Sequence, residues 1–480
     1  MKKTIVTLVA LLLTLSVAVF PVLADEGSTA ITTVGYSSSR VVTKDLSSVP
    51  CIHFCMDEDY KDSAEFKIST ADDLTYFAEM VNDYWKTFEN VTVYLENDID
   101  LGGETWTPIG YNESKTISNK FAGTFDGLGH MVDNFVVSSD TTAELLTLGF
   151  FGCVVEGATI KNLVIGPRAS VTYTGTSTDV RCGGIVGSFK SKKSVLDNCY
   201  NMATVTSSTL YAGGVLGFSE GNESEIKNCT NTGAVQSNQR AGGILGYLGN
   251  KAITIDNCRN TGTVTANATG VKCYVGGIVG MLNNKDAVCA VTNCINNGAI
   301  TGSVTLPENA TAEVIAESVV AVGPIAGMTR GDSTYSGNLN YGTVTPASNL
   351  VTTTSVFGAY YNTTEDTAKT KLGQGNQNLA GTADATLSTD VETITPSFNT
   401  AVCPNAPAEN DPSDDNDDGS DGTTTAPSTT KKPDTTTAPS NTTTEAPTEE
   451  KKGCGSVAGG IAIMLMTVGA AVVVAKKKEL

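Results

Sequence analysis

Few side chains in this 480-residue chain could carry proton-transfer or metal chemistry. It has two histidines, His53 and His130, and no His-Glu-x-x-His pattern of the kind that zinc proteases use. Cys51 and Cys55 flank His53, a spacing compatible with a metal ion, but we favour free thiols or a local disulfide for this pair. His130 stands beside a glycine and is interpreted as a turn residue.

The acidic residues best placed for catalysis precede the regular part of the chain, where departures from a repeat leave room for a site. They are Asp98, Asp100, Glu104 and Asp126. Within the repeats, Asp197 and Asp256 precede the asparagine segments and could stack, whereas Arg240, Arg259 and Arg330 are scattered. Polysaccharide lyases and hydrolases need carboxylates that converge, often with calcium. Because the arginines are scattered and the acids few, we expect no catalytic, cofactor-binding or metal-binding residues.

The elements that must position all these groups are set by a repeated Gly-Gly-aliphatic-aliphatic-Gly box, which is followed by an Asn-Cys-x-Asn segment. The glycines of the boxes include Gly183, Gly187, Gly213, Gly217, Gly242, Gly246, Gly276 and Gly280. The asparagines of the segments are Asn198, Asn201, Asn228, Asn231, Asn257, Asn260, Asn293 and Asn296. Degenerate boxes at 149–152 and 323–327 bring the total to six, which predicts six coils. A period of roughly thirty residues without helical spacing predicts a solenoid of short parallel strands.

Each part of the repeat has an expected structural role. The aliphatic residues should stack into one interior column of Ile185, Val215, Ile244 and Ile278. The glycines should supply positive φ or permit close approach of coils, and the asparagines should form a ladder of side-chain amides. The four cysteines of the segments should fill interior space, in preference to a metal site or to disulfides between coils.

The box and its asparagine-containing strand, over about 149–344, resemble the GLUG repeat of bacterial surface proteins. Residues 93–101, 106–110 and 121–127 resemble the lead-in that precedes such repeats. The resemblance implies a right-handed parallel β-helix on a secreted or surface-attached protein. Some relatives adjoin IgA1-specific metallopeptidases and others look like adhesins, so the resemblance implies no activity.

The N-terminal part of the chain predicts export and a cap. Residues 1–24 have the basic start, apolar core and small-residue end of a secretory signal, and 25–65 are interpreted as a polar, loosely ordered leader. In the region 66–148 we expect a capping helix and the first irregular coils, with Thr70 as the N-cap and Asp73 at N3. The apolar face of this helix should comprise Leu74, Phe77, Ala78, Val81 and Trp85.

The C-terminal part predicts an anchor. After the repeats at 149–347, residues 348–403 should form a last coil and a C-terminal cap, and the Thr, Pro and Asp-rich stretch 404–452 a disordered stalk. Residues 453–475 are apolar enough for one transmembrane helix, followed by a basic cytoplasmic tail at 476–480. No Leu-Pro-x-Thr-Gly motif precedes the span, so we expect plain membrane anchoring rather than sortase attachment.

Together these features favour an all-β ectodomain outside a Gram-positive bacterial cell membrane, attached by a single pass. A formal net charge of −20 argues against nucleic acid as a partner, and 6% aromatic residues count against a dedicated sugar-stacking site. The favoured function is an adhesin-like interaction protein for a host or matrix glycan or protein. The alternatives are a polysaccharide lyase or hydrolase and a passive surface spacer.

Overall fold

The computed structural model describes residues 31–34, 42–116, 119–284, 287–318, 320–331, 333–346, 351–352, 357–361, 375–384, 386 and 391–394. All of them belong to one unit, residues 1–411. The expected signal peptide, stalk, membrane span and basic tail lie outside the described residues. No helix within the described ranges is both long and apolar enough to cross a membrane.

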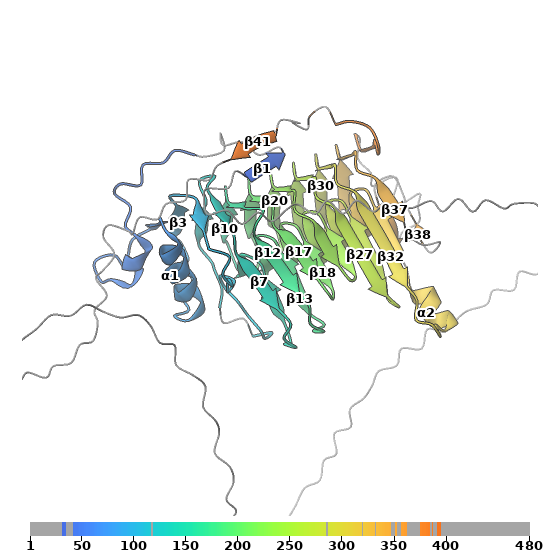
Figure 1. Cartoon of the computed structure of the whole chain (residues 1–480), viewed down its shortest axis with the longest axis horizontal. Helices are drawn as coiled ribbons and strands as arrows, with labels where there is room; N and C mark the ends of the chain where they lie inside the picture. Colours follow the sequence, from blue (N-terminus) through green and yellow to red (C-terminus); the bar gives the residue numbers. More distant parts are fainter. Residues whose placement is uncertain are drawn as a thin grey trace, which may run out of the picture. The chain divides into compact units, whose positions relative to one another are not determined.

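Five parallel sheets, numbered 1 to 5 here, run along the unit (Figure 1). Sheet 1 contains β2 (Glu65–Ile68), β3 (Thr92–Leu95), β5 (Thr124–Asp126), β10 (Thr159–Lys161), β15 (Val195–Asp197), β20 (Ser224–Lys227), β25 (Ile253–Asp256), β30 (Cys289–Thr292) and β35 (Ser333–Ser336). Sheet 2 contains β4 (Ile99–Asp100), β6 (Met131–Asp133), β11 (Val164–Ile165), β16 (Tyr200–Asn201), β21 (Thr230–Asn231), β26 (Arg259–Asn260), β31 (Ile295–Asn296), β36 (Leu339–Asn340) and β40 (Gln377–Asn378).

The other three parallel sheets have seven described strands each. Sheet 3 contains β7 (Val136–Ser139), β12 (Ser170–Tyr173), β17 (Thr204–Ser207), β22 (Val235–Ser237), β27 (Val264–Thr269), β32 (Ile300–Thr305) and β37 (Val344–Pro346). Sheet 4 contains β8 (Leu146–Leu148), β13 (Val180–Gly183), β18 (Tyr211–Gly213), β23 (Arg240–Gly242), β28 (Cys273–Gly276), β33 (Val320–Gly323) and β38 (Val351–Thr352). Sheet 5 contains β9 (Phe151–Val154), β14 (Val186–Phe189), β19 (Leu216–Ser219), β24 (Leu245–Gly249), β29 (Val279–Asn283), β34 (Ala326–Arg330) and β39 (Phe357–Tyr361).

From β5 onward the chain visits sheets 1 to 5 in order and then starts the next coil, so the fold is a parallel β-helix, as the repeat predicts. Sheets 3, 4 and 5 each have seven strands among the described residues, which makes seven coils, one more than the six boxes. The seventh coil, β35 to β39, has no Gly-Gly pair between its last two strands.

The predicted aliphatic column lies inside the coils. The backbone N–H of Ile185 donates to the carbonyl of Val215 at 3.2 Å, and Val215 and Ile244 each donate to the next member at 3.1 and 2.9 Å. All four side chains of the column, which ends at Ile278, are 0% exposed. One coil could not bury this surface alone, so the stack of coils is the stable unit.

The helix α1 (Ala71–Asn82) lies at the N-terminal end of the stack (Figure 1). Thr70 and Asp73 form the predicted capping box, and Phe77 packs on Phe121 and Phe125 with ring centroids 5.8 and 5.9 Å apart. The prediction for Trp85 is wrong. The helix ends at Asn82, and Trp85 is 68% exposed, because the chain has already turned away from the core.

The segment expected to be a loose leader is partly ordered. Residues 42–56 include the buried side chains Leu46, Val49 and Ile52, and Ile52 belongs to the short 3-10 helix η2 (Ile52–Met56). Further out, β1 (Ile31–Val34) pairs antiparallel with β41 (Val391–Ile394). A six-residue helix, α2 (Ala312–Glu317), stands between β32 and β33. Residues 42–65 are more ordered than expected because their apolar residues, such as Leu46, Val49 and Ile52, are buried, although the composition of 25–65 as a whole is polar.

Candidate functional site

The second asparagine of each segment is buried and bonds to its counterpart in the next coil. Nδ2 of Asn201 donates to Oδ1 of Asn231 at 2.8 Å, and the same bond continues at 2.7–2.8 Å through Asn260 and Asn296 to Asn340. Each amide also donates to the carbonyl two residues further on. We call this row of buried asparagines the inner ladder. Because no water reaches these groups, the inner ladder satisfies donors and acceptors that would otherwise be costly to bury.

The first asparagine of each segment, which we call the outer asparagine, adopts the left-handed conformation. Its φ lies between 51° and 57° at Asn198, Asn228, Asn257 and Asn293. Asparagine tolerates this region better than other residues that carry a Cβ. None of the glycines in the four regular boxes has positive φ. At the corner between sheets 1 and 2 the left-handed residue is asparagine in these four coils, and Gly337, with a φ of 66°, takes the same place after β35.

The box glycines are required for close approach instead. A Cβ at Gly183 would clash with the carbonyl of Val186 in the same coil, and one at Gly184 would clash with the Asn201 amide. Sheets 4 and 5 can therefore meet at a tight corner, and the inner ladder can lie directly against the box.

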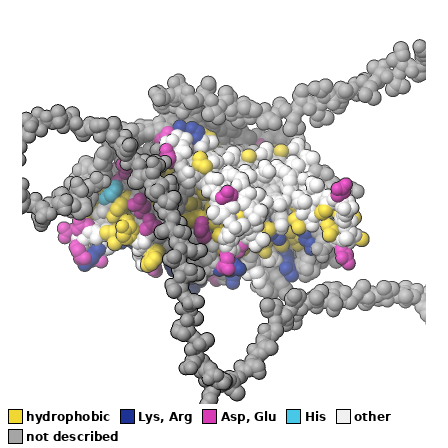
Figure 2. Space-filling view, turned by 60° about the horizontal axis from the view of Figure 1, so that its bottom comes forward, with side chains coloured by type: hydrophobic (Ala, Val, Ile, Leu, Met, Phe, Trp, Pro, Cys, Tyr) yellow, Lys and Arg dark blue, Asp and Glu magenta, His cyan; other side chains and the backbone are white. Residues whose placement is uncertain are grey.

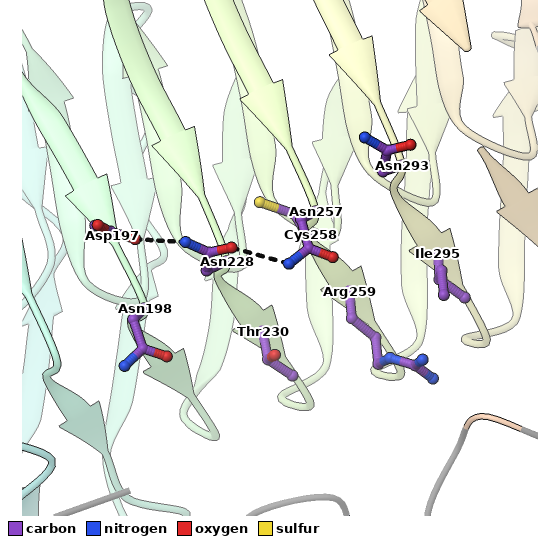
Figure 3. Close-up of a pocket in the computed structure, with 9 residues that line it drawn as sticks. All are labelled: Asp197, Asn198, Asn228, Thr230, Asn257, Cys258, Arg259, Asn293 and Ile295. Atoms are coloured by element: carbon purple, nitrogen blue, oxygen red, sulfur yellow. Dashed lines mark hydrogen bonds between the residues drawn. The ribbon is translucent and has the colours of Figure 1, made fainter. Parts of the chain in front are cut away.

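An open pocket of about 600 Å³ runs along the outer asparagines (Figure 3). Asn228 donates to Asp197 at 2.7 Å, and Asn257 donates to Asn228 at 2.9 Å. Arg259, at the edge of the pocket, donates to Asp384 at 2.8 Å and to Asn297 at 3.1 Å. The two charged residues that line the pocket, Asp197 and Arg259, are both engaged in these hydrogen bonds. Neither is therefore well placed to act as a general acid or base.

The cysteines of the segments form an interior column. Cys199, Cys229, Cys258 and Cys294 are at most 1% exposed, and Sγ of Cys199 contacts the carbonyl of Ile160 at 3.4 Å. Burial raises the pKa of Cys199 and Cys258 well above the ordinary thiol value, which keeps them protonated. All ten cysteines within the described ranges are buried thiols outside any disulfide.

The acids of the first coils are engaged in local structure. Asp98 accepts from the backbone of Met131 at 2.8 Å and lies 3.3 Å from Nδ1 of His130. Asp100 pairs with Arg168 at 3.0 Å. The remaining members of this group are Asp126, which pairs with Lys161 at 3.1 Å, and the exposed Glu104. The acids therefore do not converge on one point.

A cluster that the sequence did not indicate lies where sheets 4 and 5 meet. Tyr211 and Tyr247 stack with ring centroids 4.9 Å apart and an interplanar angle of 11°, and Phe218 lies 5.1 Å from each. Both tyrosines are half-buried, whereas Phe218 is 6% exposed. We call this group, with the charged residues around it, the aromatic cleft.

The tight corner explains why these rings meet. Outward-facing residues seven apart lie on the two sides of each box, such as Arg181 and Ser188, whose Nη1 and Oγ are 3.0 Å apart. The same offset relates Tyr211 to Phe218, and in the following coil Arg240 to Tyr247. A low overall content of aromatic residues does not reveal such a cluster, because each coil supplies only two of its residues. A search for aromatic or arginine residues seven positions apart, one on each side of a box, could have found it.

Charged residues surround the cleft. Arg181 lies 3.9 Å from the ring centre of Phe218 and donates to Glu220 at 2.6 Å, and Lys190 also pairs with Glu220. The Cζ of Arg240 lies 5.3 and 5.0 Å from the ring centres of Tyr211 and Tyr247. Its Nε has no hydrogen-bond partner among the described residues. The cleft therefore combines an aromatic platform with a guanidinium that is incompletely satisfied.

The structure also places the residues around His53. Cys51 and His53 lie together, with Sγ and Nδ1 3.4 Å apart. Cys55 is directed elsewhere and interacts with Tyr76, and burial raises the pKa of its thiol to about 11. Asp73, interpreted from the sequence only as a capping residue, completes the group around His53 at 3.0 Å from Nδ1.

Comparison with known proteins agrees with this architecture. The fold and its laddered corners define a parallel β-helix, and the family model described as the GLUG motif matches residues 208–236 and 237–265. The chain therefore contains GLUG repeats, and the matched stretch contributes Tyr211, Phe218 and Tyr247 to the aromatic cleft.

A solved structure resembles part of the chain. It is the crystal structure of "a putative immunoglobulin A1 protease from Bacteroides ovatus", with 21% sequence identity and a TM-score of 0.46. The match covers 64% of this chain and 87% of that one. No curated protein matches the sequence.

Proposed function

We propose that the chain is a surface-displayed interaction protein whose aromatic cleft binds an acidic extracellular glycan. The observation that carries the proposal is the stacked pair Tyr211 and Tyr247, half-buried and flanked by Arg240. Aromatic faces bind the apolar faces of sugar rings, and a guanidinium forms paired hydrogen bonds with a carboxylate or sulfate.

Charge supports an acidic ligand. The chain as a whole has a formal net charge of −20, which repels polyanions. Around the cleft, Arg181 and Lys190 pair with acids, but Arg240 adds a cation to which no acid is paired among the described residues. Lys251 also lines the cleft and is exposed. The residues that line the cleft include the cations Arg181, Lys190, Lys192 and Lys251 and the acids Glu156, Asp179 and Glu220. With Arg240 beside the tyrosines, the cleft has a small excess of positive charge on an acidic chain.

The same contacts argue for binding rather than for hydrolysis. Burial opposes ionisation of Glu220, but the charges of Arg181 and Lys190 outweigh it and hold the pKa of Glu220 below its ordinary value. A carboxyl of this kind stays ionised near neutral pH and is a poor general acid. For this reason a polysaccharide lyase or hydrolase is a weaker hypothesis than a binding protein.

The proposed setting follows from the whole sequence. We infer a signal peptide at 1–24 and a membrane helix at 453–475 that holds the protein on the outer surface of a Gram-positive cell through the stalk at 404–452. The coils would wind right-handed, the usual hand of parallel crossovers, and α1 would protect the first coil from end-to-end association. Backbone and side chains that are neither hydrophobic nor charged cover much of the middle of the described surface in Figure 2, a composition compatible with an exposed surface.

Binding of the purified chain to immobilised polysaccharides tests this function. We expect it to bind heparin or polygalacturonate, which carry sulfates or carboxylates, more tightly than neutral dextran, and the binding should weaken with added salt. The double variant Tyr211→Ala, Tyr247→Ala should weaken binding at least tenfold because it removes both stacking faces.

Tyr84→Ala is the matched control, because Tyr84 is 63% exposed and is not among the residues that line the cleft. It should bind as the unaltered chain does. Equal binding of dextran and the two polyanions, or an undiminished affinity of the cleft variant, would contradict the proposal. Selective capture of a protein by the cleft would instead favour a protein ligand.

A further inference from the structure

Three side chains with metal-binding atoms meet beside the N-terminus of α1. Nδ1 of His53 lies 3.0 Å from Oδ1 of Asp73 and 3.4 Å from Sγ of Cys51. The third separation, from Sγ of Cys51 to Oδ1 of Asp73, is 3.3 Å. In the part of the chain that the structure describes, this is the one group of three such residues whose ligand atoms all lie within 4.8 Å of one another.

We propose that Cys51, His53 and Asp73 bind a zinc ion. With the usual zinc–ligand distances, the sulfur, nitrogen and oxygen atoms of a tetrahedral site stand about 3.3–3.6 Å apart. The observed separations of 3.0–3.4 Å need to grow by only a few tenths of an ångström when an ion enters. A thiolate with an imidazole favours zinc over calcium or magnesium, which prefer oxygen ligands.

The surroundings hold two of the ligands in position. Oδ2 of Asp73 accepts hydrogen bonds from the backbone of Ser69 at 2.7 Å and Thr70 at 3.1 Å, which leaves Oδ1 directed at the cluster. The His53 ring lies against Tyr76, with centroids 4.4 Å apart. Contacts of this kind orient metal ligands and lower the cost of bringing them together.

Access to the site is one-sided. The side chain of His53 is 22% exposed, whereas that of Asp73 is 1% exposed and Cys51 is 3% exposed. An ion could enter along the imidazole, and a water molecule could fill its fourth position from the same side. The low exposure of Cys51 argues against a nucleophilic role for its thiol, because a substrate could not reach the sulfur.

Zinc at this position would join η2 to α1, both of which precede the first regular coil. Cys51 is the N-cap of η2 and forms an isolated bridge with Lys67 of β2, while His53 belongs to η2 and Asp73 to the first turn of α1. The ion would therefore fasten residues 42–56 to α1, at the end where the coil stack begins. Binding to the folded state alone raises stability in proportion to the logarithm of the free zinc concentration.

Titration of the purified full chain with Co²⁺ tests the proposal. Cobalt replaces zinc in such sites, and a cobalt–thiolate bond gives a near-ultraviolet charge-transfer band together with visible bands of a tetrahedral ion. We expect these bands to saturate at one ion per chain and to disappear when zinc is added. Zinc should also raise the melting temperature, and a chelator should reverse that rise.

The variants Cys51→Ser and His53→Gln should each lower the affinity for cobalt at least tenfold. Cys55→Ser is the matched control, since Cys55 is also buried and four residues away, and it should keep the bands. Using both His53→Gln and Cys51→Ser guards against a variant that fails to fold. The absence of a charge-transfer band in the unaltered chain, or an equal band in both ligand variants, would overturn the proposal.

Discussion

Replacing Asn260 by alanine removes one step of the inner ladder. The Asn260 amide accepts a hydrogen bond from Asn231, donates one to Asn296 and donates another to the carbonyl of Gly262, each at 2.8 Å. Asn260 is 0% exposed, so water cannot replace the lost partners without entering the stack. The substitution therefore leaves three neighbouring polar groups with one partner fewer.

Each hydrogen bond of this kind contributes about 1 kcal/mol, and a buried group left without a partner costs about 1–3 kcal/mol. Three such losses predict a decrease of about 3–5 kcal/mol in the free energy of unfolding. Equilibrium unfolding in urea, followed by circular dichroism and by tyrosine fluorescence, measures this decrease and shows whether the two signals still change together.

The outer asparagine of the same coil provides the control. Asn257 is exposed, has a φ of 51° and makes one side-chain bond, to Asn228. Asn257→Gly keeps the left-handed turn accessible and should cost about 1 kcal/mol or less. If Asn260→Ala proves no more destabilising than Asn257→Gly, the hydrogen bonds of the inner ladder do not stabilise the stack.

Ile244→Asp should lower the melting temperature sharply, because it buries an unpaired carboxylate at a position that is 0% exposed; an unchanged melting curve would contradict the interior column. Cys258→Ser should cost only about 1 kcal/mol, since its thiol makes weak contacts with backbone carbonyls; thermal melting measures this, and a much larger loss would imply a further role for the thiol. Burial opposes ionisation of Asp384, but hydrogen bonds from Asn297 and Thr386 and the charge of Arg259 lower its pKa to about 2. Its contribution is therefore present above about pH 4 and lost as the pH falls toward 2, so Asp384→Asn should melt below the unaltered chain at pH 6 and together with it near pH 2. Deleting 455–480 should release the protein into the medium, and a truncated chain that stays in the membrane fraction would point to another anchor.

The repeat made the stacked architecture predictable from the sequence. Ile185 and its counterparts recur at a fixed distance from the box glycines, and only stacking can bury them all. The capping box of Thr70 and Asp73 was predictable for a related reason, because it depends on residues three apart in the chain. The prediction for Trp85 failed because the spacing of apolar residues shows which face of a helix is buried but not the residue at which the helix ends.

Contacts between distant residues were harder to predict. Nothing in the local pattern shows that Asn198, rather than a box glycine, adopts positive φ, since both residue types suit that conformation. The stack of Tyr211 on Tyr247 depends on a corner angle that no local pattern encodes. Asp73 already had a role in the helix cap, and its second oxygen meets His53 only because η2 packs on α1.

Hydrogen–deuterium exchange with and without a bound polyanion tests whether the corner of sheets 4 and 5 is the binding surface. We predict slower exchange in peptides from β18 and β19 (Tyr211–Ser219) and from β23 and β24 (Arg240–Gly249) when heparin or polygalacturonate is added. Exchange along the outer asparagine pocket around Asn228 should stay the same. Protection confined to that pocket, or absent from the corner strands while the ligand is bound, would contradict the account.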